Sequence, residues 1–171
     1  MLTLCLLRHA KSDWGDASLD DFDRPLAKRG QNAAPRMGAY MAEHGIAPEL
    51  ILCSRAVRAR QTLDLVLPCL AGGPTVVYEQ DLYLAPPSVL LARLRKVVAK
   101  IRRVLIVGHD PGMQALAVEL AGAGDPRMLQ AIAAKFPTAA LAVFTFKARD
   151  WGKVGPGKGR LDAFVTPKML A

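Results

Sequence analysis

Leu2–Leu7 (LTLCLL) runs directly into Arg8 and His9, and this junction decides the fold that the sequence predicts. A short, almost continuous apolar run that ends in polar residues is typical of a buried strand in a parallel sheet. Ligands of open α/β sheets bind beyond the carboxyl ends of the strands. Arg8 and His9 therefore stand where such a fold would place a binding site.

Short apolar runs and amphipathic segments alternate along the rest of the chain. We expect further strands at 50–53, 74–78, 103–107, 139–146 and 161–166, and helices at 27–43, 55–67, 86–100 and from Pro111 onward. Strands that alternate with helices indicate a three-layer α/β/α fold, with a mostly parallel sheet covered by helices on both faces.

Three further features concern the organisation of the chain. Pro35 falls inside the first expected helix, where a proline removes a backbone hydrogen bond. The segment 147–160, rich in glycine and basic residues, is expected to be a solvated loop between the last two strands. A length of 171 residues is typical of one domain, so we expect residues 1–171 to fold as a single unit.

Composition and charge limit the classes of function. Lys and Arg total 23 against 15 Asp and Glu, and the resulting charge of +8 would attract anionic ligands or partners. The chain has no zinc-finger spacing, RNP-like aromatic sequence or long basic run, so we do not expect a nucleic-acid partner. Cys5, Cys53 and Cys69 fit reduced thiols and a cytoplasmic location, and no apolar run is long enough to predict a membrane span.

The histidines carry the strongest chemical signal. Two of the three, His9 and His109, each follow an expected strand directly, so both imidazoles can reach one crevice. Arg8 adjoins His9, Arg58 lies in the first turns of a helix that follows a strand, and the helix from Pro111 offers its amino terminus beside His109. Guanidinium groups and helix N-termini bind phosphate oxygens, so together these groups predict a phosphate cradle. Taken alone, Arg58 is better explained as an ordinary helix-surface charge. The spacing of His and Cys predicts no metal site.

Five segments of the chain resemble motifs of one known family, and they occur in the order that this family has. LLRHAKSDW (6–14), DFDRPLAKRG (21–30), CSRAVRARQT (53–62), VGHDPGM (107–113) and FPTAALAVF (136–144) resemble the histidine phosphatase superfamily, the group that includes the phosphoglycerate mutases. The resemblance is greatest to its short SixA-type phosphohistidine phosphatases. It implies a phosphoglycerate mutase-like fold, with His9 as the nucleophile and with Arg8, Arg58 and His109 holding the phosphoryl oxygens.

The resemblance implies a metal-independent phosphatase without a cofactor that forms a phosphohistidine intermediate and acts on phosphohistidine in proteins. Ala10 stands where the commonest family motif has Gly. Larger members use an acid to protonate the leaving group, and here Glu79 and Asp81 are the candidates, although both can equally be surface carboxylates. The alternatives are a phosphomonoesterase or mutase for a small phosphorylated substrate, and a non-catalytic module that binds phosphoproteins.

Overall fold

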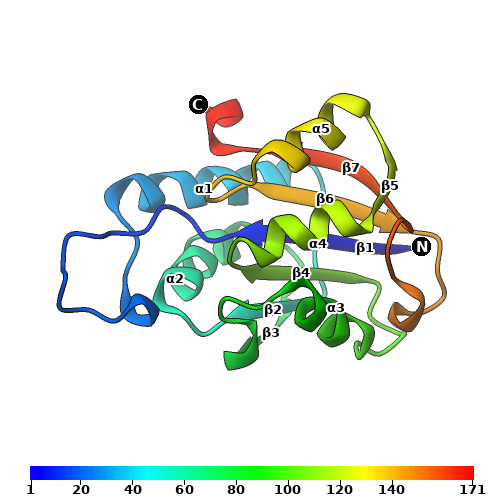
Figure 1. Ribbon diagram of the computed structural model, residues 1–171, viewed down its shortest axis with the longest axis horizontal. Coiled ribbons are helices and arrows are strands. Elements are labelled where there is room, and N and C mark those ends of the chain that lie inside the picture. The colour runs from blue at the N-terminus through cyan, green and yellow to red at the C-terminus, as the bar shows by residue number, and fades with distance from the viewer.

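The computed structural model describes residues 1–171 and contains a seven-stranded sheet in the order β3-β2-β4-β1-β6-β7-β5 (Figure 1). The strands are β1 (Leu2–Arg8), β2 (Leu50–Ser54), β3 (Thr75–Glu79), β4 (Arg103–Gly108), β5 (Ala121–Gly124), β6 (Leu141–Phe146) and β7 (Gly159–Val165). The helices are α1 (Lys28–Glu43), α2 (Val57–Val66), α3 (Pro87–Arg95), α4 (Gly112–Leu120) and α5 (Pro126–Ala134).

The sheet is mostly parallel, as predicted. β4 pairs in parallel with β1 and with β2, and β2–β3 and β5–β7 are also parallel pairs. Only β6 runs against its neighbours, β1 and β7. The carboxyl ends of β1, β2 and β4 therefore meet at one edge of the sheet, where parallel α/β folds place their sites.

The two faces of β1 explain why its sequence is apolar without alternation. Leu4 and Leu6 pack in the core cluster that contains residues of α3, α4 and α5, whereas Cys5 and Leu7 pack in the cluster that contains residues of α1 and α2. Successive side chains of a strand point to opposite faces, so a strand covered on both sides needs apolar residues at every position. Figure 1 shows the helices on the two sides of the sheet.

Several expected boundaries differ from those of the structure. α1 continues through Pro35, and the buried Met37 and Met41 anchor it to the core beyond the proline. α3 ends at Arg95 instead of reaching residue 100. The sequence analysis predicted neither β5 nor α5. The short strand β5 (AGAG) lacks the β-branched and aromatic residues that favour strands, whereas α5 does begin with a local signal, the N-cap Asp125 followed by Pro126.

The segment 147–160 is more than the solvated loop that the sequence predicted. Trp151 begins a 3-10 turn, Trp151–Lys153, and its side chain is fully buried. The indole Nε1–H donates to the carbonyl oxygen of Ile101 at 2.6 Å, which satisfies its polar group inside the core. The prediction was wrong here because one buried tryptophan anchors an otherwise polar segment. No helix of the fold combines the length and apolar character that a membrane crossing needs.

Candidate active site

The pairing of β1 with β4 brings the two strand-end histidines together. Arg8 lies opposite Gly108 in the parallel register, so His9 and His109 leave the sheet side by side. The backbone N–H of His9 donates to the carbonyl oxygen of Gly108 at 3.0 Å. The imidazole ring centroids are 5.2 Å apart, and the residues are only 6% and 3% exposed.

The hydrogen bonds of His9 define its tautomer. Nδ1 lies 2.7 Å from the carbonyl oxygen of Ala10, and since a carbonyl can only accept, Nδ1 must carry the hydrogen. Nε2 is then unprotonated, and its lone pair accepts a long hydrogen bond from Arg58 Nε–H at 3.4 Å. Burial, with smaller contributions from the neighbouring His109, Arg58 and Arg8, lowers the pKa of His9 to about 3 against the opposing effect of the hydrogen bond to Ala10. At neutral pH His9 is therefore an uncharged imidazole with an available Nε2.

Ser54, at the end of β2, orients His109. Ser54 Oγ lies 2.8 Å from His109 Nε2 and also accepts from the backbone N–H of Ala56 at 3.2 Å. The Ser54 hydroxyl can therefore donate its own hydrogen to His109 Nε2. The neutral His109 ring then carries its hydrogen on Nδ1, which is a donor. Burial lowers the pKa of His109 to about 3, with the charge of Arg58 acting in the same direction.

Arg58 belongs to this site and not to the helix surface. The residue is 3% exposed, and its Nη1 and Nη2 donate to the backbone oxygen and to Oδ2 of Asp21 at 2.6 and 2.9 Å. The Asp21 carboxylate also accepts from Arg24 at 2.9 Å and from the Tyr83 hydroxyl. Burial opposes ionisation of Asp21, but these hydrogen bonds outweigh it and hold the pKa below its usual range. Asp21 therefore stays ionised and holds the Arg58 guanidinium next to His9.

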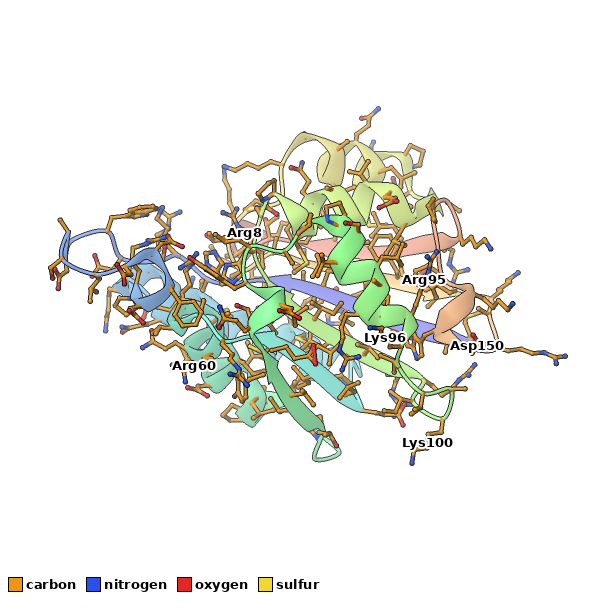
Figure 2. The ribbon with its side chains drawn as sticks, turned by 60° about the horizontal axis from the view of Figure 1, so that its bottom comes forward. Arg8, Arg60, Arg95, Lys96, Lys100 and Asp150 are labelled. Atoms are coloured by element: carbon orange, nitrogen blue, oxygen red, sulfur yellow. The ribbon has the colours of Figure 1, made fainter.

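Arg8 Nε and His109 Nδ1 are the two buried side-chain polar atoms of the chain that have no hydrogen-bond partner. Arg8 Nη1 donates to the carbonyl oxygen of Phe136 at 2.8 Å and lies 3.6 Å from Asp110, so the guanidinium is held in place. Figure 2 shows Arg8 at the carboxyl end of β1. Buried donors without partners are costly, and an oxyanion between them would satisfy both.

Both donors line one pocket of about 270 Å³. Its lining residues are Arg8, His9, Lys11, Ser12, Trp14, Arg24, Arg58, Leu84, His109, Asp110 and Thr138. Arg24 donates to Ser12 Oγ at 2.7 Å and stacks on Trp14, whose side chain is 70% exposed at the pocket mouth. The pocket is small, polar and dominated by cations, which suits a phosphoryl group.

The structure does not bring the two candidate acids into this pocket. The Glu79 carboxylate is held by Arg93 Nε at 2.7 and 2.9 Å, and Asp81 is exposed on a 3-10 turn. The carboxylate in the lining is Asp110, which follows His109 directly in the chain. Sequence analysis missed Asp110 and Asp21, although each lies inside a segment that carried the family resemblance.

Comparison with known proteins identifies the family of this chain. Residues 4–82 match the family model described as histidine phosphatase superfamily (branch 1). An uncharacterised protein of Mycobacterium tuberculosis is 36% identical over 164 residues, which cover 95% of this chain and all of that protein. The chain belongs to the histidine phosphatase superfamily.

Solved structures place this histidine phosphatase in the SixA type. A structure from Agrobacterium tumefaciens, provisionally called phosphohistidine phosphatase SixA, is 30% identical with a TM-score of 0.82 over 97% of this chain and 98% of that one. A structure from Nakamurella multipartitia with the same provisional name is 29% identical, also with a TM-score of 0.82, over 97% and 96% of the two chains. The fold is thus the expected phosphoglycerate mutase-like one, and the protein is an enzyme of this superfamily.

The two buried histidines predict that stability falls in mild acid. Unfolded histidines titrate near pH 6.5, whereas His9 and His109 of the folded histidine phosphatase titrate near pH 3. Between these values the unfolded state binds more protons, so stability is greatest above pH 6.5 and falls as the pH drops toward 3. From about pH 7.5 to about pH 5 the free energy of unfolding should fall by up to about 2 kcal/mol per histidine.

Urea unfolding at the two pH values measures this difference. His9→Gln should remove about half of the fall, because one of the two groups is gone. His44→Ala serves as the control, since His44 is an exposed histidine that contacts Tyr40 by stacking and through Nδ1, which lies 2.9 Å from the Tyr40 carbonyl oxygen. An identical pH dependence in the parent and in His9→Gln would show that buried His9 does not contribute.

Proposed function

We propose that residues 1–171 form a single histidine phosphatase domain that removes phosphate from phosphohistidine in proteins, through a phosphoenzyme at His9. The observation that carries the proposal is the neutral, buried His9, whose Nε2 is unprotonated and whose pocket is also lined by two residues with buried donors that lack protein partners. The three cysteines are free thiols, which supports a reducing, cytoplasmic compartment.

The reaction has two in-line steps. His9 Nε2 attacks the phosphorus and the bond from phosphorus to the substrate nitrogen breaks. The substrate imidazole already carries a proton on its other nitrogen, so it leaves as a neutral ring. Water then attacks the phosphorus of the phosphoenzyme and the bond to Nε2 breaks. Inorganic phosphate leaves with both protons of the water, and Nε2 regains its lone pair. Arg8, Arg58 and His109 donate to the phosphoryl oxygens in both steps, so the cradle offsets the charge that each transition state carries.

The surroundings of the pocket favour a phosphohistidine substrate. A protonated imidazole is a good leaving group, so its departure does not require a strong acid in the enzyme. Glu79 and Asp81 lie outside the pocket lining, and the one carboxylate in the lining, Asp110, lies 3.6 Å from Arg8. The exposed Trp14 at the mouth leaves the site accessible to a side chain carried by another protein.

Competing substrates test this proposal. The purified enzyme, in the presence of a chelator, is given a phosphohistidine peptide, p-nitrophenyl phosphate and an alkyl phosphate, and phosphate release is followed. We expect kcat/KM for the phosphohistidine peptide to exceed that for the alkyl phosphate by at least about tenfold. Faster turnover of the alkyl phosphate would contradict the proposal.

A second candidate function is hydrolysis of small phosphomonoesters, and Asp110 is the observation that favours it. The Asp110 carboxylate lines the pocket, and burial raises its pKa against the opposing charge of Arg8. A carboxylic acid with a raised pKa can protonate an alkoxide as it leaves. In this second function Asp110 would act as the acid, in place of Glu79 or Asp81, which the sequence suggested.

Asp110→Asn separates the two functions. If Asp110 acts as the acid, alkyl phosphate turnover should fall by about 100-fold, while phosphohistidine turnover should change by less than about threefold. Asp81→Asn is the matched control, because Asp81 is exposed and outside the pocket lining. Equal losses on both substrates would show that Asp110 acts only by holding Arg8, and not as an acid.

A further inference from the structure

A second, larger cleft lies beside the phosphoryl pocket. It has a volume of about 660 Å³, and two residues, Lys11 and Thr138, line both the cleft and the pocket. We call it the basic cleft, after its five cationic side chains: Lys11, Arg29, Arg36, Lys135 and Lys168. No aspartate or glutamate side chain lines it. A group that extends from the pocket past Lys11 therefore enters a strongly positive surface.

The five cations come from separate elements that the fold holds together. Arg29 and Arg36 lie two turns apart on one face of α1, Lys135 follows α5, and Lys168 belongs to the 3-10 turn Pro167–Leu170. Figure 1 shows this C-terminal turn next to α1. Close packing fixes α1 against the loop after β1, since a Cβ on Gly30 would lie 2.2 Å from the Lys11 carbonyl oxygen.

The charges of the basic cleft have no partner within the chain. None of its five cations makes an ion pair or a side-chain hydrogen bond, whereas Arg8, Arg24 and Arg58 of the phosphoryl pocket all do. Arg29, Arg36, Lys135 and Lys168 are exposed, and Lys11 is half-buried. Like charges gathered in this way repel one another, so an anionic ligand would be attracted.

We propose that the basic cleft binds an acidic segment of the phosphorylated protein, next to the phosphohistidine in the pocket. This inference rests on the proposed function and names the substrate class. The helical rise from Arg29 to Arg36 is about 10 Å, which corresponds to about three residues of extended chain and exceeds the reach of one phosphate. The lining contains no aromatic side chain on which a base could stack, so a peptide fits better than a nucleotide.

The test reverses three charges that lie outside the phosphoryl pocket, because a single exposed pair contributes little. The cleft variant is R29E/R36E/K135E. The control variant, K147E/K153E/K158E, makes the same change in net charge at exposed lysines of another surface hollow. That hollow includes Asp150, which Figure 2 shows with Arg95, Lys96 and Lys100, well away from Arg8.

Two phosphohistidine peptides, identical except for flanking glutamates or serines, serve as substrates at low salt. For the parent enzyme we expect kcat/KM to be about tenfold higher with the glutamate peptide. The cleft variant should lose this preference and the control variant should keep it, while p-nitrophenyl phosphate turnover stays the same in all three. Equal kcat/KM for both peptides in the parent, or an equal loss in both variants, would overturn the proposal.

Binding measured without catalysis keeps the test independent of the proposed function. Fluorescence anisotropy with a labelled, unphosphorylated decaglutamate should give a Kd about tenfold weaker for the cleft variant alone. If no phosphohistidine peptide is hydrolysed, the proposed function fails. The binding measurement still tests whether the basic cleft binds an acidic segment. Absence of cleft-dependent binding, or tighter cleft-dependent binding of a decanucleotide RNA, would overturn the acidic-segment proposal.

Discussion

His9→Ala is expected to reduce phosphohistidine turnover by about four orders of magnitude or more, because the variant has no atom that can accept the phosphoryl group. In the parent, rapid quench at alkaline pH with radiolabelled substrate should trap a phosphoenzyme that is stable to alkali and labile to acid. The variant should form none. Arg8, Arg58 and His109 can still bind the phosphoryl group, so substrate binding should be weakened far less than turnover.

The third histidine offers a matched control for this experiment. His44→Ala removes an exposed imidazole that lies outside the pocket lining, and it should leave both turnover and the trapped phosphoenzyme unchanged. Circular dichroism must show that His9→Ala is folded, since His9 is buried. Full turnover in a folded His9→Ala enzyme would contradict the phosphoenzyme mechanism.

Arg58→Ala is expected to give the second-largest loss, about 100-fold to 1000-fold in kcat/KM, because it removes a fixed cationic donor from the cradle. It also leaves the Asp21 carboxylate, a negative charge close to the pocket, with Arg24 as its only remaining arginine partner. Steady-state kinetics with the phosphohistidine peptide measures the loss. Arg58→Lys should recover only part of it, since lysine cannot contact Asp21 and the phosphoryl group with a planar fork.

Arg60 provides the control on the same helix. Arg60 is exposed, it does not line the phosphoryl pocket, and Figure 2 shows it on α2 apart from Arg8. Arg60→Ala removes one positive charge from α2, as Arg58→Ala does, but at a position outside the pocket where solvent screens the charge. We therefore expect kcat/KM to stay within about twofold of the parent value. A comparable loss in both arginine variants would mean that Arg58 acts only through the net charge of the helix.

The elements nearest the site were predictable because local sequence signals them. Leu2–Leu7 and the run before Gly108 are apolar at successive positions, which indicates strands buried on both faces. β5 was missed because its glycine and alanine carry no such signal and its pairing with β7 is a long-range contact, whereas α5 was missed although Asp125 and Pro126 signal the start of a helix. The burial of Trp151 was also not predicted. Its indole hydrogen-bonds to Ile101, which is distant in the sequence, whereas its neighbours in the chain are polar.

The position of a carboxylate at the end of a strand did not predict which acid lies in the pocket. Glu79 does end β3, as its position in the sequence suggested, but β3 is the outermost strand and the carboxylate is held by Arg93. Asp110 reaches the pocket because β4 is next to β1 in the sheet. Strand order depends on packing across the whole chain, and the spacing of residues along it does not reveal that order.

By itself the sequence determined the class of fold, the family, and the side chains that the phosphate cradle would need, because strand patterns and motifs are local properties. Only the tertiary structure decided which groups meet. The register of β1 on β4 sets His9 beside His109, Asp21 fixes Arg58, and the packing of α1 gathers five unpaired cations beside the pocket. These are contacts between residues far apart in the chain, and the free energy that selects them comes from burying both faces of the sheet at once.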